Sequence, residues 1–348
     1  MNAHRQRGLT LIELLVSIAI GLIILLAIGT VYVNSNNLMR QREDQTQLNE
    51  PARIATGILH QNLVQAGFVD IFDLNAANRA QASAIFIPGN EALTNLFLRN
   101  PAVAPVSSPI STIFAGLTPV FGCDGAMTST PNAILTAGAP AVQACGAANA
   151  TRHSLQIAYQ AIPNDAANAA NSLIAANPAV GVGVDCLQQN VPAGTTFVIN
   201  RFFVEVPAAE GIPQLRCAGS GNNQAQSMAP GVEEFILRYQ MSAPGAPGAA
   251  VAAGGGQAQY VSAAAVAASV QGWSAVTAVE ICIVSATDAT RGAAAQGTTV
   301  LQPTRPTCQR NAAGGFAPNI ARAAGDNRLW KRFTSVVSLR NAVYATPL

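Results

Sequence analysis

An apolar segment near the N-terminus constrains this chain more than any other feature. After the basic opening MNAHRQRG, the sequence stays apolar from Leu9 to Val33, apart from Glu13 and a few small or hydroxylated residues. As a helix, a segment of this length spans about 37 Å, which exceeds the roughly 30 Å hydrocarbon thickness of a bilayer. Arg5 and Arg7 precede it and hold the N-terminus in the cytoplasm. The sequence therefore predicts a single membrane-spanning helix with an exported head.

A secretory signal peptide, a plain signal anchor and a buried core helix each explain only part of this pattern. The segment is longer than the 7 to 15 residues typical of a signal peptide core, and no clear A-x-A cleavage site follows it. A core helix needs no basic lead. A plain anchor gives no reason for Glu13, because a carboxylate inside the membrane costs about 2.5 to 3.5 kcal/mol. Glu13 is thus expected to have a specific partner.

Glu13 belongs to a short motif at the start of the apolar segment, in which Gly8 is followed by Leu-Thr-Leu-Ile-Glu13. This motif resembles the processing site of type IV prepilins, whose pattern is glycine, an apolar residue, Thr, Leu, any residue and Glu. Leu9 stands in place of the commoner Phe. The resemblance implies that prepilin peptidase cleaves between Gly8 and Leu9, that the new Leu9 amine is N-methylated, and that the helix packs in the core of a filament. Glu13 would then pair with the Leu9 amine of a neighbouring subunit.

Beyond the apolar segment, the spacing of apolar residues from Ile54 to Ala66 is helical. We expect an amphipathic continuation of the helix, with a kink or restart at Pro51 and an end at Gly67. The predicted organisation is a leader at 1–8, a transmembrane or filament-core helix at 9–33, the amphipathic continuation at 34–67 and an exported globular head at 68–348.

Alternation of apolar and polar residues, together with a high content of β-branched residues, predicts five clear strands in the head. They are Leu155 to Ala161, Thr195 to Val206, Glu233 to Met241, Ala275 to Ala286 and Phe333 to Asn341. A short strand is expected at Ala84 to Ile87, and loops at Ala218 to Pro230 and Ala243 to Gln259, which offer little apolar area. The predicted fold class is α+β, with the long helix packed on an antiparallel β-sheet head.

Six cysteines follow the apolar segment, at positions 123, 145, 186, 217, 282 and 308. Without a C-x-x-C pair, and with three histidines in the chain, no metal site is expected. An exported head favours disulfides, for which six cysteines allow 15 connectivities. Sequential neighbours are preferred, above all Cys186 with Cys217 and Cys282 with Cys308, which leaves Cys123 with Cys145. Buried free thiols are the alternative.

Charge and histidine placement argue against nucleic-acid binding and catalysis. Charged residues make up 10% of the chain, and no stripe of Lys and Arg is present, so direct nucleic-acid binding is not expected. His60 suits a polar helix position, and His153 beside Ser154 suits a solvated loop before a strand. Neither forms a plausible nucleophile and base, and no phosphate-binding or metalloprotease motif occurs. No enzyme activity and no cofactor are predicted.

Two further regions carry recognisable sequence. One runs from Leu48-Asn-Glu-Pro to Ala-Gly67-Phe, and the other comprises Gly231-Val-Glu-Glu-Phe-Ile-Leu-Arg-Tyr, the strand after Trp273, and the terminal Arg332-Phe-Thr-Ser-Val-Val-Ser-Leu-Arg-Asn341. Both resemble the PilW family of type IV pilus minor pilins. Trp273 and the Arg-Asn pair are interpreted as structural. The region from Phe72 to Pro230 has no counterpart in the resemblance.

The PilW resemblance implies a minor pilin that takes part in pilus assembly as a priming or tip subunit, as in twitching motility. Its partners would be other minor pilins, the major pilin, prepilin peptidase and the inner-membrane assembly platform, with a tip adhesin as an open alternative. The protein would lie in the inner membrane through residues 9–33, with its head in the periplasm, and then in the extracellular pilus. A J-type minor pseudopilin of a type II secretion system and a surface-binding tip module are the alternatives.

Overall fold

The computed structural model describes residues 10–67, 118–131, 143–160, 184–191, 197–241, 260–269, 272–287, 303–311, 314–324, 326 and 328–340. Its contacts divide the chain into a first unit, Met1–Asn49, and a second, Glu50–Leu348. The strand expected at Ala84 to Ile87 and the loop expected at Ala243 to Gln259 lie outside the described residues.

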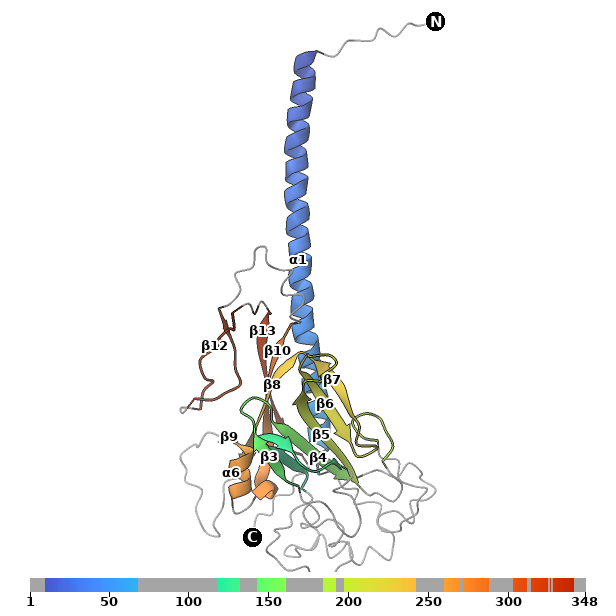
Figure 1. Ribbon diagram of the computed structural model, residues 1–348, viewed down its shortest axis with the longest axis vertical. Coiled ribbons are helices and arrows are strands. Elements are labelled where there is room, and N and C mark those ends of the chain that lie inside the picture. The colour runs from blue at the N-terminus through green and yellow to red at the C-terminus, as the bar shows by residue number, and fades with distance from the viewer. Residues whose placement is uncertain are drawn as a thin grey trace, which may run out of the picture. The chain divides into compact units, whose positions relative to one another are not determined.

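The first element is one long helix, α1 (Leu11–Gln65), which runs without interruption through the apolar segment and its expected amphipathic continuation (Figure 1). Pro51 lies inside α1, and the helix continues through it. The restart at Pro51 that the sequence analysis had allowed does not occur. The helix ends just before Gly67, whose φ of 72° lies in the left-handed region that favours glycine. The Gly67 N–H then donates to the Ala158 carbonyl at 2.9 Å, which joins the helix end to a strand.

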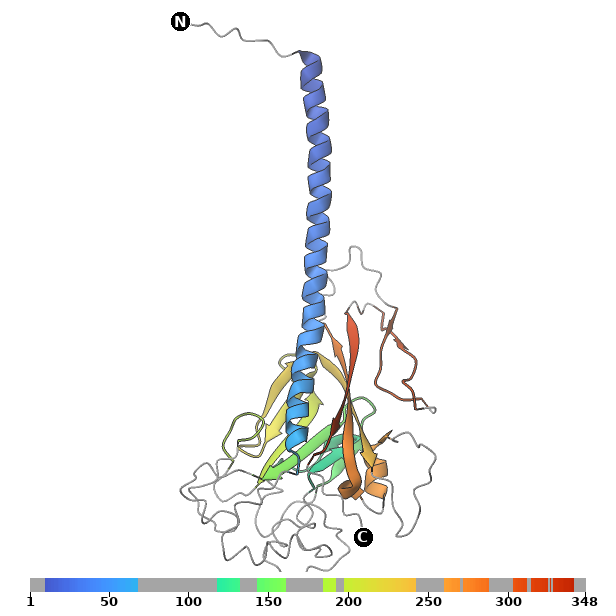
Figure 2. The same ribbon diagram turned by 180° about the vertical axis from the view of Figure 1, so that it is seen from behind.

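Two larger antiparallel sheets form the described head (Figures 1 and 2). The five-stranded sheet has the order β1 (Val120–Cys123), β4 (Ser154–Gln160), β5 (Phe197–Glu205), β6 (Gln214–Gly219) and β7 (Ala225–Pro230). The four-stranded sheet has the order β13 (Trp330–Ser338), β10 (Val276–Ala286), β8 (Val232–Met241) and β9 (Tyr260–Val261). The five clear strands of the sequence analysis correspond to β4, β5, β8, β10 and β13.

Smaller elements complete the described head. Two two-stranded pairs are β2 (Gly125–Met127) with β3 (Cys145–Ala148) and β11 (Thr304–Arg305) with β12 (Ile320–Ala321); the short helices are α6 (Ala263–Ala268) and η2 (Gly272–Ala275). The head is therefore an α+β arrangement of a helix and antiparallel sheets, as expected.

One strand contradicts the sequence analysis. The stretch from Ala218 to Pro230 was expected to be a loop, yet β7 occupies Ala225–Pro230 and pairs with β6. β7 is an edge strand in which half of the side chains are exposed and only Ala229 is fully buried, so its position depends largely on pairing with β6. A hydrophobicity pattern does not reveal such a strand.

The core lies between the last turns of α1 and the two sheets (Figure 2). Ala55, Leu59 and Leu63 are fully buried at helical spacing, and they pack in one cluster with Phe202 of β5 and Leu237 of β8. β10 is almost wholly buried because it is an inner strand of its sheet, and most of its side chains are apolar.

Candidate functional site

The N-terminus of α1 is closed by a reciprocal pair, Thr10 and Glu13. The Glu13 Oε2 accepts from the backbone N–H and from the Oγ1 hydroxyl of Thr10, each at 3.1 Å. In return, the backbone N–H of Glu13 donates to Thr10 Oγ1 at 3.4 Å. This is a capping box, in which two backbone N–H groups at the start of a helix gain partners from side chains.

The sequence analysis predicted an intermolecular partner for Glu13 and missed this intramolecular one. The signal was present, because Thr-x-x-Glu ahead of an apolar run is the capping-box pattern. Gly8 and Leu9, the predicted processing residues, lie outside the described part of the chain.

The apolar half of α1 carries its side chains on the surface of the structure. The apolar stretch Leu11–Asn36 is 26 residues long. Its most apolar window has a mean hydropathy of 2.9, and none of that window is buried inside the protein. Large side chains such as Leu11 and Leu26 are 78% and 72% exposed. By length and composition the helix can cross a membrane. A surface this apolar requires lipid or other apolar helices around it.

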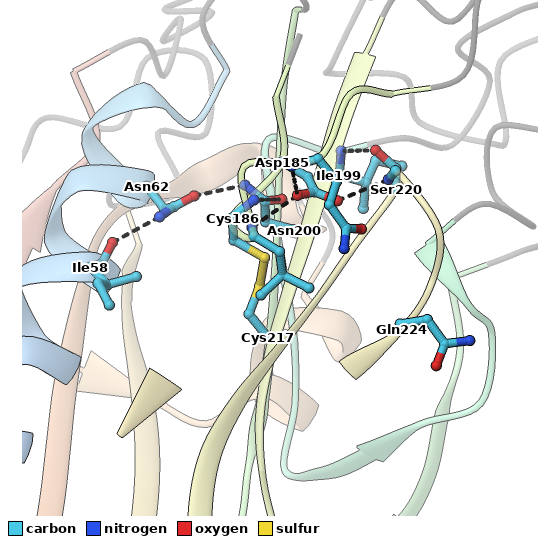
Figure 3. Close-up of a disulfide and its surroundings, with 12 residues drawn as sticks. Ile58, Asn62, Asp185, Cys186, Ile199, Asn200, Cys217, Ser220 and Gln224 are labelled. Atoms are coloured by element: carbon cyan, nitrogen blue, oxygen red, sulfur yellow. Dashed lines mark hydrogen bonds between the residues drawn. A yellow bond between two sulfur atoms is a disulfide. The ribbon is translucent and has the colours of Figure 1, made fainter. Parts of the chain in front are cut away.

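The C-terminal half of α1 is joined to the head by a buried pair of asparagines (Figure 3). Asn200 of β5 donates from Nδ2 to Oδ1 of Asn62 at 2.7 Å, and Asn62 donates to the Ile58 carbonyl at 2.9 Å. Asn200 also accepts the Cys186 N–H at 2.9 Å through its Oδ1. Helix, sheet and the loop around Cys186 thus share one hydrogen-bonded chain.

Asp185 holds that loop against the sheet. Its Oδ1 accepts the N–H groups of Leu187 and Gln189 at 2.8 and 3.0 Å, and its Oδ2 accepts the Gly221 N–H at 2.9 Å (Figure 3). The residue is only 2% exposed. A Cβ at Gly219 would lie 2.0 Å from Asp185 Oδ2, so this approach requires glycine.

Three disulfides fasten the described head. They join Cys123 with Cys145, Cys186 with Cys217, and Cys282 with Cys308, the sequential pairing that the sequence analysis preferred. The second lies beside the asparagine pair (Figure 3). The third ties the segment around β11 to the inner strand β10.

His153 lies inside the head and not in the solvated loop that was expected. It is 8% exposed, and its Nδ1 accepts the Leu237 N–H at 3.1 Å. Burial lowers the pKa of His153, against a smaller raising effect of Asp124, whose Oδ1 lies 3.7 Å from Nδ1. Ser154 is also buried, and its Oγ donates to the Gly125 carbonyl. His60, by contrast, is exposed on α1, as expected.

Asp124 and Tyr239 complete the surroundings of His153. Asp124 accepts the N–H groups of Ala263 and Ala264 at 3.0 and 2.9 Å and so fixes the start of α6. Burial raises the pKa of the Tyr239 hydroxyl well above its ordinary value. The described contacts serve the fold, and among the described residues no group of three His, Cys, Asp or Glu side chains is arranged to hold a metal ion.

Two family models match the chain, one at each end. Residues 3–29 match the prokaryotic N-terminal methylation motif, and residues 201–341 match PilW, the type IV pilus-assembly protein W. The resemblance drawn from the sequence is thereby confirmed. One boundary is wrong, because the PilW match begins at residue 201, inside the region from Phe72 to Pro230 that was expected to have no counterpart. No curated protein matches the chain.

Among solved structures, the chain is similar to the type IV-like pilin TTHA1219 from Thermus thermophilus. The two are 13% identical, and the match covers 55% of this chain and 80% of that one, with a TM-score of 0.26. A likeness of this degree carries no argument about function.

Proposed function

We propose that this chain, with a methylation motif at one end and a PilW-type head at the other, is a minor pilin that takes part in type IV pilus assembly. The proposal rests on the positions of the two family matches. The methylation motif covers residues 3–29 and therefore overlaps the exposed apolar half of α1. The PilW match covers the strands of the head from within β5 to β13.

In this proposal residues 1–8 are a leader that prepilin peptidase removes after Gly8, and Leu9 becomes the N-methylated first residue. Residues 9–33 hold the protein in the inner membrane and later line the filament core, residues 34–67 continue the helix, and 68–348 form the exported head. Three disulfides within the head suit an oxidising compartment outside the cytoplasm.

Glu13 is proposed to serve both the single chain and the filament. Its Oε2 is engaged by Thr10, whereas no described residue donates to Oε1. A second oxygen is therefore available for the Leu9 amine of a neighbouring subunit, and a charge pair of this kind would fix the axial register between helices in an apolar core.

Partners in this role are the major pilin, other minor pilins and the inner-membrane assembly platform, and the head is placed in a priming or tip complex. The match to a pilus-assembly family favours this role over that of a secretion pseudopilin.

The test is mass spectrometry of the N-terminal peptide, both from the protein's own membranes and from sheared surface filaments. A peptide that begins at N-methylated Leu9 in both fractions is expected. An intact Met1, or a cut near residue 30, would refute pilin processing. A processed protein that never enters filaments, although secretion fails without its gene, would instead assign it to a secretion system.

A further inference from the structure

The outer face of the four-stranded sheet carries a cluster of three arginines: Arg238 of β8, Arg310 in the segment after β11, and Arg332 of β13. They come from three separate stretches of sequence, and the fold brings them together. The register places Arg238 opposite Glu280 and Arg332 opposite Val284, and Glu280 and Val284 share one face of β10. Side chains at directly opposite positions of an antiparallel pair point to the same side.

Phe316 holds two of these arginines. The Arg310 guanidinium lies 3.7 Å and that of Arg332 3.6 Å from the centroid of the Phe316 ring. Stacking on an aromatic ring holds a guanidinium in place and leaves its N–H edges free to donate. A second stack of the same kind lies on this face. The guanidiniums of Arg305 and Arg328 lie 4.9 and 4.4 Å from the centroid of the Trp330 ring.

The two stacks differ in their counter-charges. Arg305 pairs with Glu234, and Arg328 with Glu233 and Asp326, so carboxylates balance that pair of arginines. In the Phe316 cluster, Glu280 pairs with Arg310, and it is the one carboxylate there among the described residues. Arg332 donates to the Thr307 carbonyl and Arg238 to that of Tyr260, both uncharged acceptors. Two positive charges therefore have no carboxylate partner within the described chain.

The cluster is accessible and concentrated. All three arginines are half-buried rather than enclosed. Burial lowers the pKa of Arg310, and the proximity of Arg238 and Arg332 lowers it further. Glu280 balances one of the three charges, and the other two repel each other in the free protein. An incoming carboxylate would relieve that cost while accepting bidentate hydrogen bonds.

Charge is also divided unevenly along the sequence. Residues 303–348 contain seven basic side chains and one acidic, whereas residues 9–302 contain ten basic and sixteen acidic. Two of the three arginines, Arg310 and Arg332, belong to the basic stretch. Contacts between oppositely charged segments of neighbouring subunits are of the head-to-tail kind that generates filaments.

We infer that Arg238, Arg310 and Arg332 form a docking site for carboxylate side chains on the head of a neighbouring pilus subunit. The inference rests on the proposed function and adds the surface through which this head is recognised. Phe316 is the positioning residue, since it holds two of the three guanidiniums.

Photo-crosslinking of the full-length protein in cells that assemble filaments tests the site. A benzophenone amino acid in place of Val336 probes it, because Val336 is 52% exposed and lies in the same row as Glu280 and Arg238. The expected product is an adduct with another pilus subunit, identified by mass spectrometry. Its yield should fall at least fivefold when Arg238→Gln and Arg332→Gln are combined.

Two controls separate binding from folding and from total charge. Arg340→Gln removes an exposed charge just beyond β13 and should leave the yield unchanged. The combined Arg238→Lys and Arg332→Lys variant keeps both charges but loses the planar guanidinium groups that bind carboxylates in a bidentate manner. It should give an intermediate yield of the crosslinked adduct. Electrophoresis without reductant checks that Cys282 and Cys308 remain joined in every variant.

An adduct whose yield does not respond to the glutamine changes would overturn the inference, as would crosslinks to lipid or nucleic acid alone. The N-terminal peptide from the same sample distinguishes the two proposals. An N-methylated Leu9 with an unresponsive adduct refutes only the docking site, whereas an unprocessed N-terminus refutes the proposed function.

Discussion

Asn200 of β5 donates a 2.7 Å hydrogen bond to Asn62 of α1, and both amides are buried. The pair connects positions 138 residues apart in the sequence, in a region where the remaining helix contacts are mostly apolar. A buried amide that loses its partner retains the cost of its desolvation. This single hydrogen bond therefore favours one rotational and axial setting of residues 50–65 against the sheet.

Breaking this pair should destabilise the head. Asn62→Ala removes the acceptor for Asn200 and is expected to lower the free energy of unfolding by about 1 to 3 kcal/mol. Urea unfolding of the full chain in detergent, followed by tryptophan fluorescence, measures this, because both tryptophans lie in the head. Gln61→Ala at the exposed neighbouring position should change stability little. Additive effects of Asn62→Ala and Asn200→Ala would contradict the coupling.

Two glycine substitutions should act in opposite directions. Gly219→Ala drives a Cβ into the Asp185 carboxylate and should displace the loop from 184 to 191, with a loss of several kcal/mol. Gly57→Ala meets nothing within 4 Å and lies inside α1, so it should stabilise by about 0.5 to 1 kcal/mol. Thermal unfolding of the two variants beside the native protein provides the comparison. Equal effects would show that the loop does not depend on Asp185.

His153 should make the stability of the head depend on pH. Its pKa is lowered in the folded protein, mainly by burial, so the unfolded chain binds the proton more readily. The stabilisation is therefore complete above the ordinary His pKa of 6.5 and is lost as the pH falls below it. The slope contributed by one such group is at most about 1.4 kcal/mol per pH unit.

The variant that tests this is His153→Asn, because an asparagine oxygen can replace Nδ1 as the acceptor for the Leu237 N–H. Urea unfolding between pH 5 and 8 should then lose the His153 part of the pH dependence. Asp124 and Tyr239 face the same site and remain unchanged. His60→Asn on the exposed side of α1 is the matched control and should retain the native profile. A native profile in His153→Asn would rule out His153 as the titrating group.

The capping box predicts separate effects of Thr10 and Glu13 on assembly. Thr10→Ser keeps a hydroxyl at the cap and should behave as the native protein, whereas Thr10→Val loses the hydroxyl and should weaken the helix start by about 1 kcal/mol. Glu13→Ala should still be cleaved after Gly8 but should enter filaments about tenfold less, since a tenfold loss corresponds to only about 1.4 kcal/mol. Quantitative immunoblotting of sheared filaments against the membrane fraction measures this. Normal incorporation of Glu13→Ala would remove Glu13 from the assembly mechanism.

The limits of prediction follow from how each feature is encoded. Helix α1 could be predicted nearly to its ends, because its apolar run, its helical spacing and Gly67 are local properties of the sequence. The central strands could be located because they are long runs rich in apolar and β-branched residues, which are local properties of the sequence. β7 could not be predicted, because an edge strand is defined by its pairing with a neighbouring strand. Pro51 was wrongly allowed to restart the helix, because packing of α1 on the head compensates for the one backbone hydrogen bond that proline removes.

The sequence by itself determined the N-terminal methylation motif, the length of the apolar helix, the strand-rich head and the preferred pairing of neighbouring cysteines, because each depends on residues close together in the chain. Only the tertiary structure decided that His153 is buried, that Asn62 meets Asn200, and that Arg238, Arg310 and Arg332 converge on one face. These features join distant segments through sheet register and burial. No local pattern specifies which distant strand will lie opposite a given residue.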